Sequence, residues 1–315
     1  MSGSDPRSRR RHSLEPLLFL LLAIASLFAA DRLIGYGLGL VVKASDYRLS
    51  RIYAGTAASD VLVSGNSVGN AMLIPTRITK IMHRPVFSIA SHGMDAITQR
   101  AFIEDYLERQ PAPHVALIEI RPLFNTANNA PAFSTYQALS QRVRLAVHDA
   151  EGSASIWAEI FHSFRVNSPQ LPAILWKTFD RDDQQTGPSN GQINAALIAE
   201  WSSRTQKPHV SPAQLKALIA TVTQLEQKGT KVVLLMAPLH PAARGDGEWI
   251  SRAGQALQAQ LPASVDYVDW SHALSADADF EDPIHLNQQG RAALEPHFTR
   301  LIGETLARKQ IATKN

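Results

Sequence analysis

Several residues and patterns that carry common protein chemistry are missing from this 315-residue sequence. Cysteine is absent, which excludes disulfides and thiolate chemistry, although its absence fits any cellular compartment. No HExxH motif occurs and the histidines are scattered, so we expect no metal site. A GxGxxG motif is also missing, and the stretch GNSVGNAM lacks the lysine of a phosphate-binding P-loop. We therefore expect no cofactor.

The net charge is close to zero outside the N-terminus. The formal net charge is +3, and the arginines between residues 7 and 11, set against Asp5, account for the whole excess. The rest of the chain is close to neutral, so we predict no basic surface for nucleic acid.

The N-terminus combines this arginine cluster with a long apolar stretch. A charge-free run extends from Pro16 to Ala30, and LIGYGLGLVV follows Asp31 and Arg32. Together the two runs are long enough to cross a hydrocarbon layer of about 30 Å, and the arginines favour a cytoplasmic tail over residues 1–15. We predict a single-pass anchor over residues 16–42 in the cell inner membrane, with residues 43–315 periplasmic. A cleavable signal peptide is the alternative, because the first run alone has that length.

After this segment, apolar strand-like runs alternate with helical patterns. This alternation predicts a three-layer α/β/α domain with a central parallel sheet. Asp95, Ser211 and Asn287 stand where helix N-caps are expected. The predicted strands are Asp60–Val63, Pro85–Ile89, His114–Ile120, Lys231–Met236 and Val265–Val268.

The alternation breaks down over residues 124–208. Polar loops such as RDDQQTGPSNG separate helical segments that contain aromatic residues. We interpret this stretch as a helical insertion that shapes access of substrate, with a purely structural excursion as the alternative.

Two short motifs lie at opposite ends of the predicted domain. Gly65-Asn66-Ser67 ends the first predicted strand, and Asp282-Pro283-Ile284-His285 precedes the last helix. A serine hydroxyl needs a base to accept its proton and an anion to stabilise the resulting imidazolium. Ser67, His285 and Asp282 supply these groups. Each motif alone is weak, since a serine in such a turn is often an N-cap and Asp-Pro often begins a turn.

Together these motifs resemble the SGNH, or GDSL-type, hydrolase superfamily. The family serine matches Ser67, and its last-motif aspartate and histidine match Asp282 and His285. A glycine after the second strand, which lends its backbone N–H to the oxyanion hole in that family, matches Gly93 in FSIASHGMD. The resemblance implies the flavodoxin-like SGNH fold, a Ser-His-Asp triad and an oxyanion hole that contains the N–H groups of Ser67 and Gly93.

The sequence departs from the family pattern at two places. The first motif is GNSV rather than GDSL, and the third motif's Gly-x-Asn-Asp is replaced by LIEIRPLFN. Arg121 and Asn125 are therefore candidate substitutes and substrate contacts. His240 is a further candidate contact at the end of the fourth strand, or a histidine in a rigid loop between prolines.

The resemblance is to divergent membrane-anchored proteins that O-acetylate bacterial exopolysaccharides. It implies a serine-dependent esterase or O-acyltransferase acting on acyl esters of a cell-envelope polysaccharide, with envelope assembly proteins as partners. The alternative is a catalytically degenerate domain that binds polysaccharide or scaffolds an assembly complex.

Overall fold

The structure is a computed structural model that describes residues 6–124, 127–180, 190–204 and 209–314. Its central sheet has five parallel strands in the order β2-β1-β3-β4-β5. This arrangement confirms the predicted α/β class. The fourth predicted strand matches its observed bounds, and the others differ by one residue at each end. The strands are β1 (Val61–Ser64), β2 (Val86–Ser88), β3 (Val115–Glu119), β4 (Lys231–Met236) and β5 (Asp266–Asp269).

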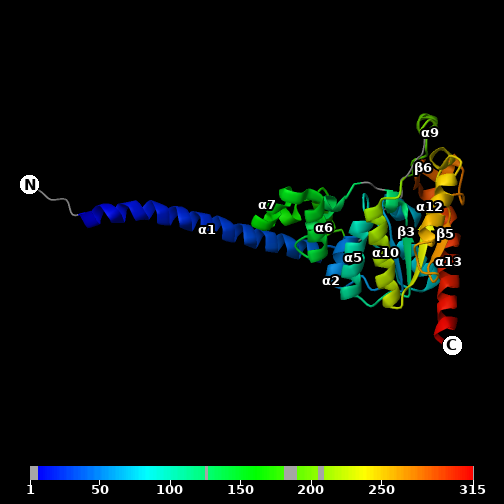
Figure 1. The fold of residues 1–315 in the computed structure, drawn as a ribbon, viewed down its shortest axis with the longest axis horizontal. Coiled ribbons are helices and arrows are strands. Elements are labelled where there is room, and N and C mark those ends of the chain that lie inside the picture. The colour runs from blue at the N-terminus through cyan, green and yellow to red at the C-terminus, as the bar shows by residue number, and fades with distance from the viewer. Residues whose placement is uncertain (1–5, 125–126, 181–189, 205–208, 315) are drawn as a thin grey trace, which may run out of the picture.

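Helices cover both faces of the sheet and bury a separate apolar core against each (Figure 1). Leu62 belongs to one core while Val61 and Val63 belong to the other, because successive side chains of a strand point to opposite faces. The first face carries α2 (Arg48–Ala54), α5 (Ala96–Arg109), α10 (Pro212–Gln227) and α12 (Glu248–Gln258). The second face carries α3 (Ser67–Met72), α4 (Pro75–Met82) and α13 (Gln288–Lys314).

Side-chain caps begin several of these helices where the sequence predicts them. The carboxylate of Asp95 accepts a hydrogen bond from the backbone N–H of Thr98 at 2.8 Å. Asn287 precedes α13, and its side-chain oxygen accepts the N–H of Gly290 at 3.0 Å. Ser211 stands at the N-cap of α10, but no hydrogen bond from its side chain caps that helix.

The N-terminal helix α1 (Pro6–Ala44) projects from the domain in Figure 1. Its Glu15–Ala44 segment contains an 18-residue window with a mean hydropathy of 2.2 and is long enough to cross a membrane. The last turns of α1 pack on the domain, where Gly35, Gly39 and Val42 form a buried stripe along one side. The predicted anchor boundary at residue 42 therefore falls inside a continuous helix.

Residues 127–180 of the expected insertion form short helices that lie beside the end of α1 (Figure 1). Residues 190–204 lie elsewhere, since the N–H of Ile193 donates to the carbonyl of Phe280 at 2.8 Å. The short helix η1 (Arg121–Phe124) precedes the insertion. The insertion helices are η2 (Ala130–Tyr136), α6 (Gln141–Glu151), η3 (Gly152–Ser155), α7 (Ile156–Ile160), η4 (His162–Val166), α8 (Leu171–Trp176) and α9 (Ala195–Ser202).

Candidate active site

Ser67 stands at the carboxyl end of β1, where it is the first residue of α3. The chain continues to β2 on one side of β1 and to β3 on the other, and open α/β sheets bind ligands at such a switch point. The turn is tight: a Cβ added at Gly65 would lie 3.0 Å from the Cβ of Glu119. Asn66 caps α3 by accepting the N–H of Val68 at 2.8 Å. Gly65 thus lets the turn pack directly against β3.

His285 reaches the same point from a small hairpin made by β6 (Phe280–Asp282) and β7 (His285–Leu286). The Nε2 atom of His285 lies 2.9 Å from the Oγ atom of Ser67, although 218 positions separate the two residues. Its Nδ1 atom lies 2.7 Å from an Asp282 carboxylate oxygen. The other Asp282 oxygen accepts the backbone N–H groups of Ile284 at 2.8 Å and His285 at 2.9 Å. The structure therefore brings the three predicted residues into one hydrogen-bond path.

The environment of Asp282 favours its ionised form, which is the form that can accept a hydrogen bond from His285. Burial raises the pKa of Asp282, but hydrogen bonds from the His285 ring and the Ile284 N–H outweigh that effect and hold the pKa below its ordinary value. An ionised Asp282 accepts a proton-bearing Nδ1, which assigns the tautomer of His285 and leaves the Nε2 lone pair facing Ser67. The side chains of Asp282 and His285 are 33% and 24% exposed, so both are partly accessible to solvent.

A second buried group, Glu119, supports the serine turn, and the sequence analysis did not single it out. Its carboxylate accepts the backbone N–H of Arg121 at 2.8 Å and also bonds to the backbone N–H of Asn66. Burial raises the pKa of Glu119 to about 8, and the N–H and charge of Arg121 oppose that effect only in part. The available signal was an acidic residue inside the apolar run VALIEI.

Arg121 follows β3 and faces two carboxyl groups. Burial lowers its pKa, while the charges of Glu119 and Asp282 act in the opposite direction. The charge of Asp282 thus favours the protonated, cationic form of Arg121.

Gly93 lies in the turn after β2, which is tied to the serine turn. The N–H of Ser91 donates to the carbonyl of Gly65 at 3.2 Å, and the N–H of Met94 closes the turn on Ser91 at 3.1 Å. Gly93 has a φ of +72°, a conformation that strongly favours glycine. Asn129 donates to its carbonyl at 3.0 Å, so that carbonyl is held by the protein.

The remaining candidates have different placements. His240 is buried and caps α11 (Pro241–Arg244): its Nδ1 accepts the Ala242 N–H at 3.2 Å, and its Nε2 lies 2.9 Å from Asp277. These bonds occupy both ring nitrogens and support the loop between prolines. Asn125 lies outside the described residues. His92, beside Gly93, has a lowered pKa because of burial and the nearby charges of His285 and Arg48.

Comparison with known proteins gives distant structural likenesses only. No family model and no curated protein matches the sequence. Similar solved structures include a Bacteroides fragilis protein assigned as an acylhydrolase, with 12% identity and a TM-score of 0.42 over 78% of this chain and 87% of that one. TesA has 14% identity and a TM-score of 0.41 over 79% and 98%. A Streptococcus pneumoniae protein assigned as a platelet activating factor has 12% identity and a TM-score of 0.41 over 90% and 98%. At these identities and TM-scores the likenesses carry no argument about the family or the chemistry of this chain.

Proposed function

We propose that the chain is a membrane-anchored serine esterase or O-acyltransferase that acts through Ser67, His285 and Asp282. The observation that supports this proposal is the hydrogen-bond path from Asp282 through His285 to Ser67, at the carboxyl end of β1. The path has the order of groups that acyl transfer to a serine needs.

In the proposed reaction, the Oγ atom of Ser67 attacks the acyl carbon of an ester while its proton passes to the Nε2 atom of His285. The imidazolium is stabilised by Asp282 and returns that proton to the leaving oxygen as the ester C–O bond breaks. The acyl group stays on Ser67 until a second hydroxyl, deprotonated by His285, attacks it. The bond between the acyl carbon and the Oγ atom of Ser67 then breaks, and His285 returns the proton to that Oγ atom. With water as this acceptor the product is a free acid, and with a sugar hydroxyl it is a new ester.

The oxyanion that forms in each attack needs hydrogen-bond donors. The proposed donors are the backbone N–H groups of Ser67, which begins α3 and has no intrahelical acceptor, and of Gly93. Each such donor contributes about 2.7–4 kcal/mol to transition-state stabilisation in comparable enzymes. A third donor is not assigned, because Asn125 lies outside the described residues.

The proposed location is the cell inner membrane, with α1 as an uncleaved anchor and the domain periplasmic. The proposed anchor is supported by the 30-residue apolar segment of α1 and by the packing of its last turns in the domain core. From the sequence resemblance, the proposed substrates are O-acetyl esters of an envelope polysaccharide, and envelope assembly proteins are the proposed partners.

The test is reaction of the full chain with a fluorophosphonate probe, which labels an activated serine without knowledge of the substrate. We expect labelling of the wild type and of Ser251→Ala, an exposed serine of α12, and none of Ser67→Ala. Turnover of a chromogenic acetyl ester should follow the same order, and product analysis with a sugar acceptor separates transfer from hydrolysis. Equal labelling of wild type and Ser67→Ala would contradict the role of Ser67, and labelling of neither would favour a non-catalytic binding domain.

A further inference from the structure

The segment α7–η4 is docked on α1 by polar contacts at Asp31. The Asp31 carboxylate accepts the backbone N–H groups of His162 at 2.7 Å and Ser163 at 3.1 Å, and the Ser163 hydroxyl at 2.6 Å. Arg32 donates to Asp31 at 2.8 Å and to the carbonyl of Ile160 at 2.7 Å. Backbone groups that would otherwise need water are therefore satisfied by protein groups where η4 meets α1, which is the requirement for backbone at membrane depth.

A glycine in α1 allows this close approach. A Cβ added at Gly35 would lie 2.7 Å from the Cβ of His162 and 2.8 Å from its carbonyl carbon. At Gly37 an added Cβ would have no atom within 4 Å. The contact is thus specific to one side of α1, and small residues allow helices to approach closely within membranes.

The position of Asp31 along α1 sets the level of this contact. A hydrocarbon layer of about 30 Å takes roughly 20 helical residues, which run from Pro16 to Gly35 when counted from the end of the charged tail. Asp31 then lies about 22 Å from Pro16, or roughly 8 Å inside the far boundary of the hydrocarbon. The segment bonded to Asp31 lies at the same level.

Several apolar side chains of α7 and η4 are exposed. Glu159 is the only acidic residue of α7, and its carboxylate forms an ion pair with the guanidinium of Arg165 in η4 at 3.1 Å. Aromatic and aliphatic side chains at this level are typical of protein segments that lie in a membrane interface. The exposed apolar side chains are Ile156, Trp157, Ile160 and Phe164.

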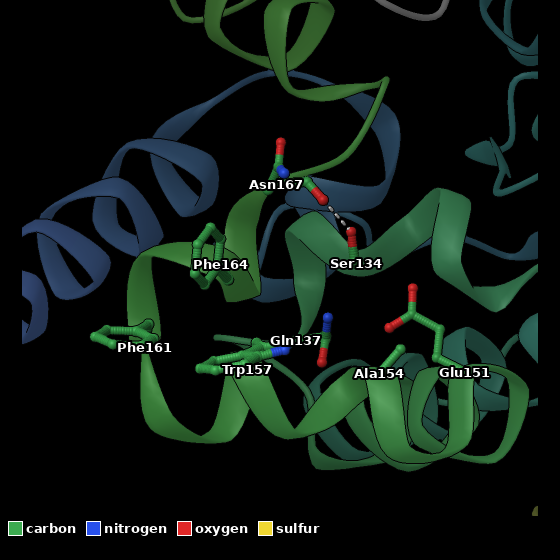
Figure 2. A pocket seen from close by; sticks show the side chains of 9 residues that line it. Ser134, Gln137, Glu151, Ala154, Trp157, Phe161, Phe164 and Asn167 are labelled. Carbon is green, nitrogen blue, oxygen red and sulfur yellow. Dashed lines mark hydrogen bonds between the residues drawn. The ribbon is translucent and has the colours of Figure 1, made fainter.

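A cavity of about 600 Å³ continues this apolar surface into the insertion. Figure 2 shows Trp157, Phe161 and Phe164 along one side of it and Glu151 on the other, with Ser134 and Gln137 between them. Trp157 stacks on Phe161 at 6.2 Å between ring centroids, and Phe164 meets Phe161 edge-on at 5.8 Å. An aromatic wall faced by polar groups matches the boundary between lipid tails and headgroups.

We propose that α7 and η4 lie in the lipid leaflet nearest the domain, with Ile156, Trp157, Ile160 and Phe164 among the acyl chains and lipid tails filling the cavity. This inference rests on the proposed membrane anchor. The insertion then holds the domain at a defined height above the membrane, since α1 runs without a break into the domain core.

A second exposed apolar side chain, Phe179, distinguishes insertion at a defined depth from nonspecific binding of exposed apolar side chains to lipid. Phe179 is 85% exposed, and α8 just before it contacts the end of α1 through a 2.6 Å hydrogen bond from Ser45 to the Ile174 carbonyl. Ser45 lies about 43 Å from Pro16 along the helix axis, well beyond the hydrocarbon layer. Phe179 is therefore expected in water or among headgroups.

Because the chain has no cysteine, a single introduced cysteine can be labelled at one site, and the depth of that site in the membrane can be measured. Ile156→Cys and Phe164→Cys variants of the full chain would carry an environment-sensitive fluorophore in liposomes that contain lipids brominated on their tails. Phe179→Cys is the matched aromatic control, and Arg252→Cys on the exposed part of α12 is the aqueous control. We expect severalfold stronger quenching at residues 156 and 164 than at either control.

A pair of glycine variants tests the docking on α1. Gly35→Leu would push η4 away from α1, so quenching at a label on residue 164 should fall. Gly37→Leu has open space and should leave that quenching unchanged.

The outcomes separate the inference from the anchor on which it rests. Liposome flotation reports the anchor, and a protein that fails to float overturns both. Flotation with unquenched labels at residues 156 and 164 overturns the inference alone, as would cross-linking of two chains through this face. Quenching at residue 179 equal to that at residue 164 would overturn the assigned depth. Fluorophosphonate labelling of Ser67 reports the proposed chemistry separately.

Discussion

The buried carboxyl group of Glu119 should make the stability of this protein depend on pH. Burial raises its pKa from 4.5 to about 8, with only partial opposition from the Arg121 N–H and charge. One of its oxygens, Oε2, is buried without a hydrogen-bond partner among the described residues. The folded protein therefore binds a proton on Glu119 more tightly than the unfolded chain does.

The sign of the effect follows from this difference. A carboxyl group whose folded pKa is raised binds a proton more tightly in the folded state, so its stabilising contribution is full below about pH 4.5 and is lost as the pH rises toward 8. The difference in pKa corresponds to a loss on the order of 5 kcal/mol in the free energy of unfolding across that interval. A neutral glutamine of the same shape does not show this loss.

The assay is denaturant unfolding of the full chain in detergent micelles at a series of pH values between about 5 and 9. The free energy of unfolding of the wild type should fall relative to Glu119→Gln as the pH rises, and the difference should level off above about pH 8. Glu304→Gln, at an exposed position of α13, controls for removal of a carboxylate. A difference between wild type and Glu119→Gln that is constant across this range would refute the reasoning.

Three further predictions concern the serine site. Asp282→Asn should lower kcat on a chromogenic acetyl ester by about 10³–10⁴-fold, because an amide no longer holds the tautomer of His285 or stabilises its cation. Fluorophosphonate labelling at the wild-type rate would contradict this role. Gly65→Ala should lower the free energy of unfolding by about 1–3 kcal/mol, since the new Cβ would lie 3.0 Å from Glu119; a thermal-unfolding midpoint equal to wild type would count against the close packing. Gly93→Ala should destabilise by about 1–2 kcal/mol because of its positive φ, although its Cβ meets no atom within 4 Å. A kcat loss larger than the unfolded fraction explains is expected if its N–H binds the oxyanion, and an unchanged kcat for the folded fraction would remove it from that role.

Local patterns in the sequence are sufficient for much of the fold. Apolar β-branched runs predict the strands because the two faces of a parallel sheet are both buried, and Asp95 marks a helix start because its side chain accepts the helix's free N–H groups. The same reasoning places Ser67 directly after β1. The ends of strands are less certain, because the last pairing residue depends on the neighbouring strand rather than on the residue itself.

The candidate site could be predicted in part. Ser67, Asp282 and His285 were identified from two motifs that are weak alone and informative together. Glu119 was not identified, since a single glutamate in a strand indicates no role until its neighbours in space are known. His240 shows the reverse problem, because a histidine at the end of a strand looks accessible until Asp277 and the Ala242 N–H are seen to occupy its ring.

The sequence by itself determined the alternation of strands and helices, the apolar N-terminal helix and the turn that carries Ser67, because each depends on residues close together in the chain. Only the tertiary structure decided that His285 meets Ser67 across 218 positions and that η4 rests on Asp31. Such contacts depend on the order of the strands and on the packing of distant segments, which no local pattern of residues encodes.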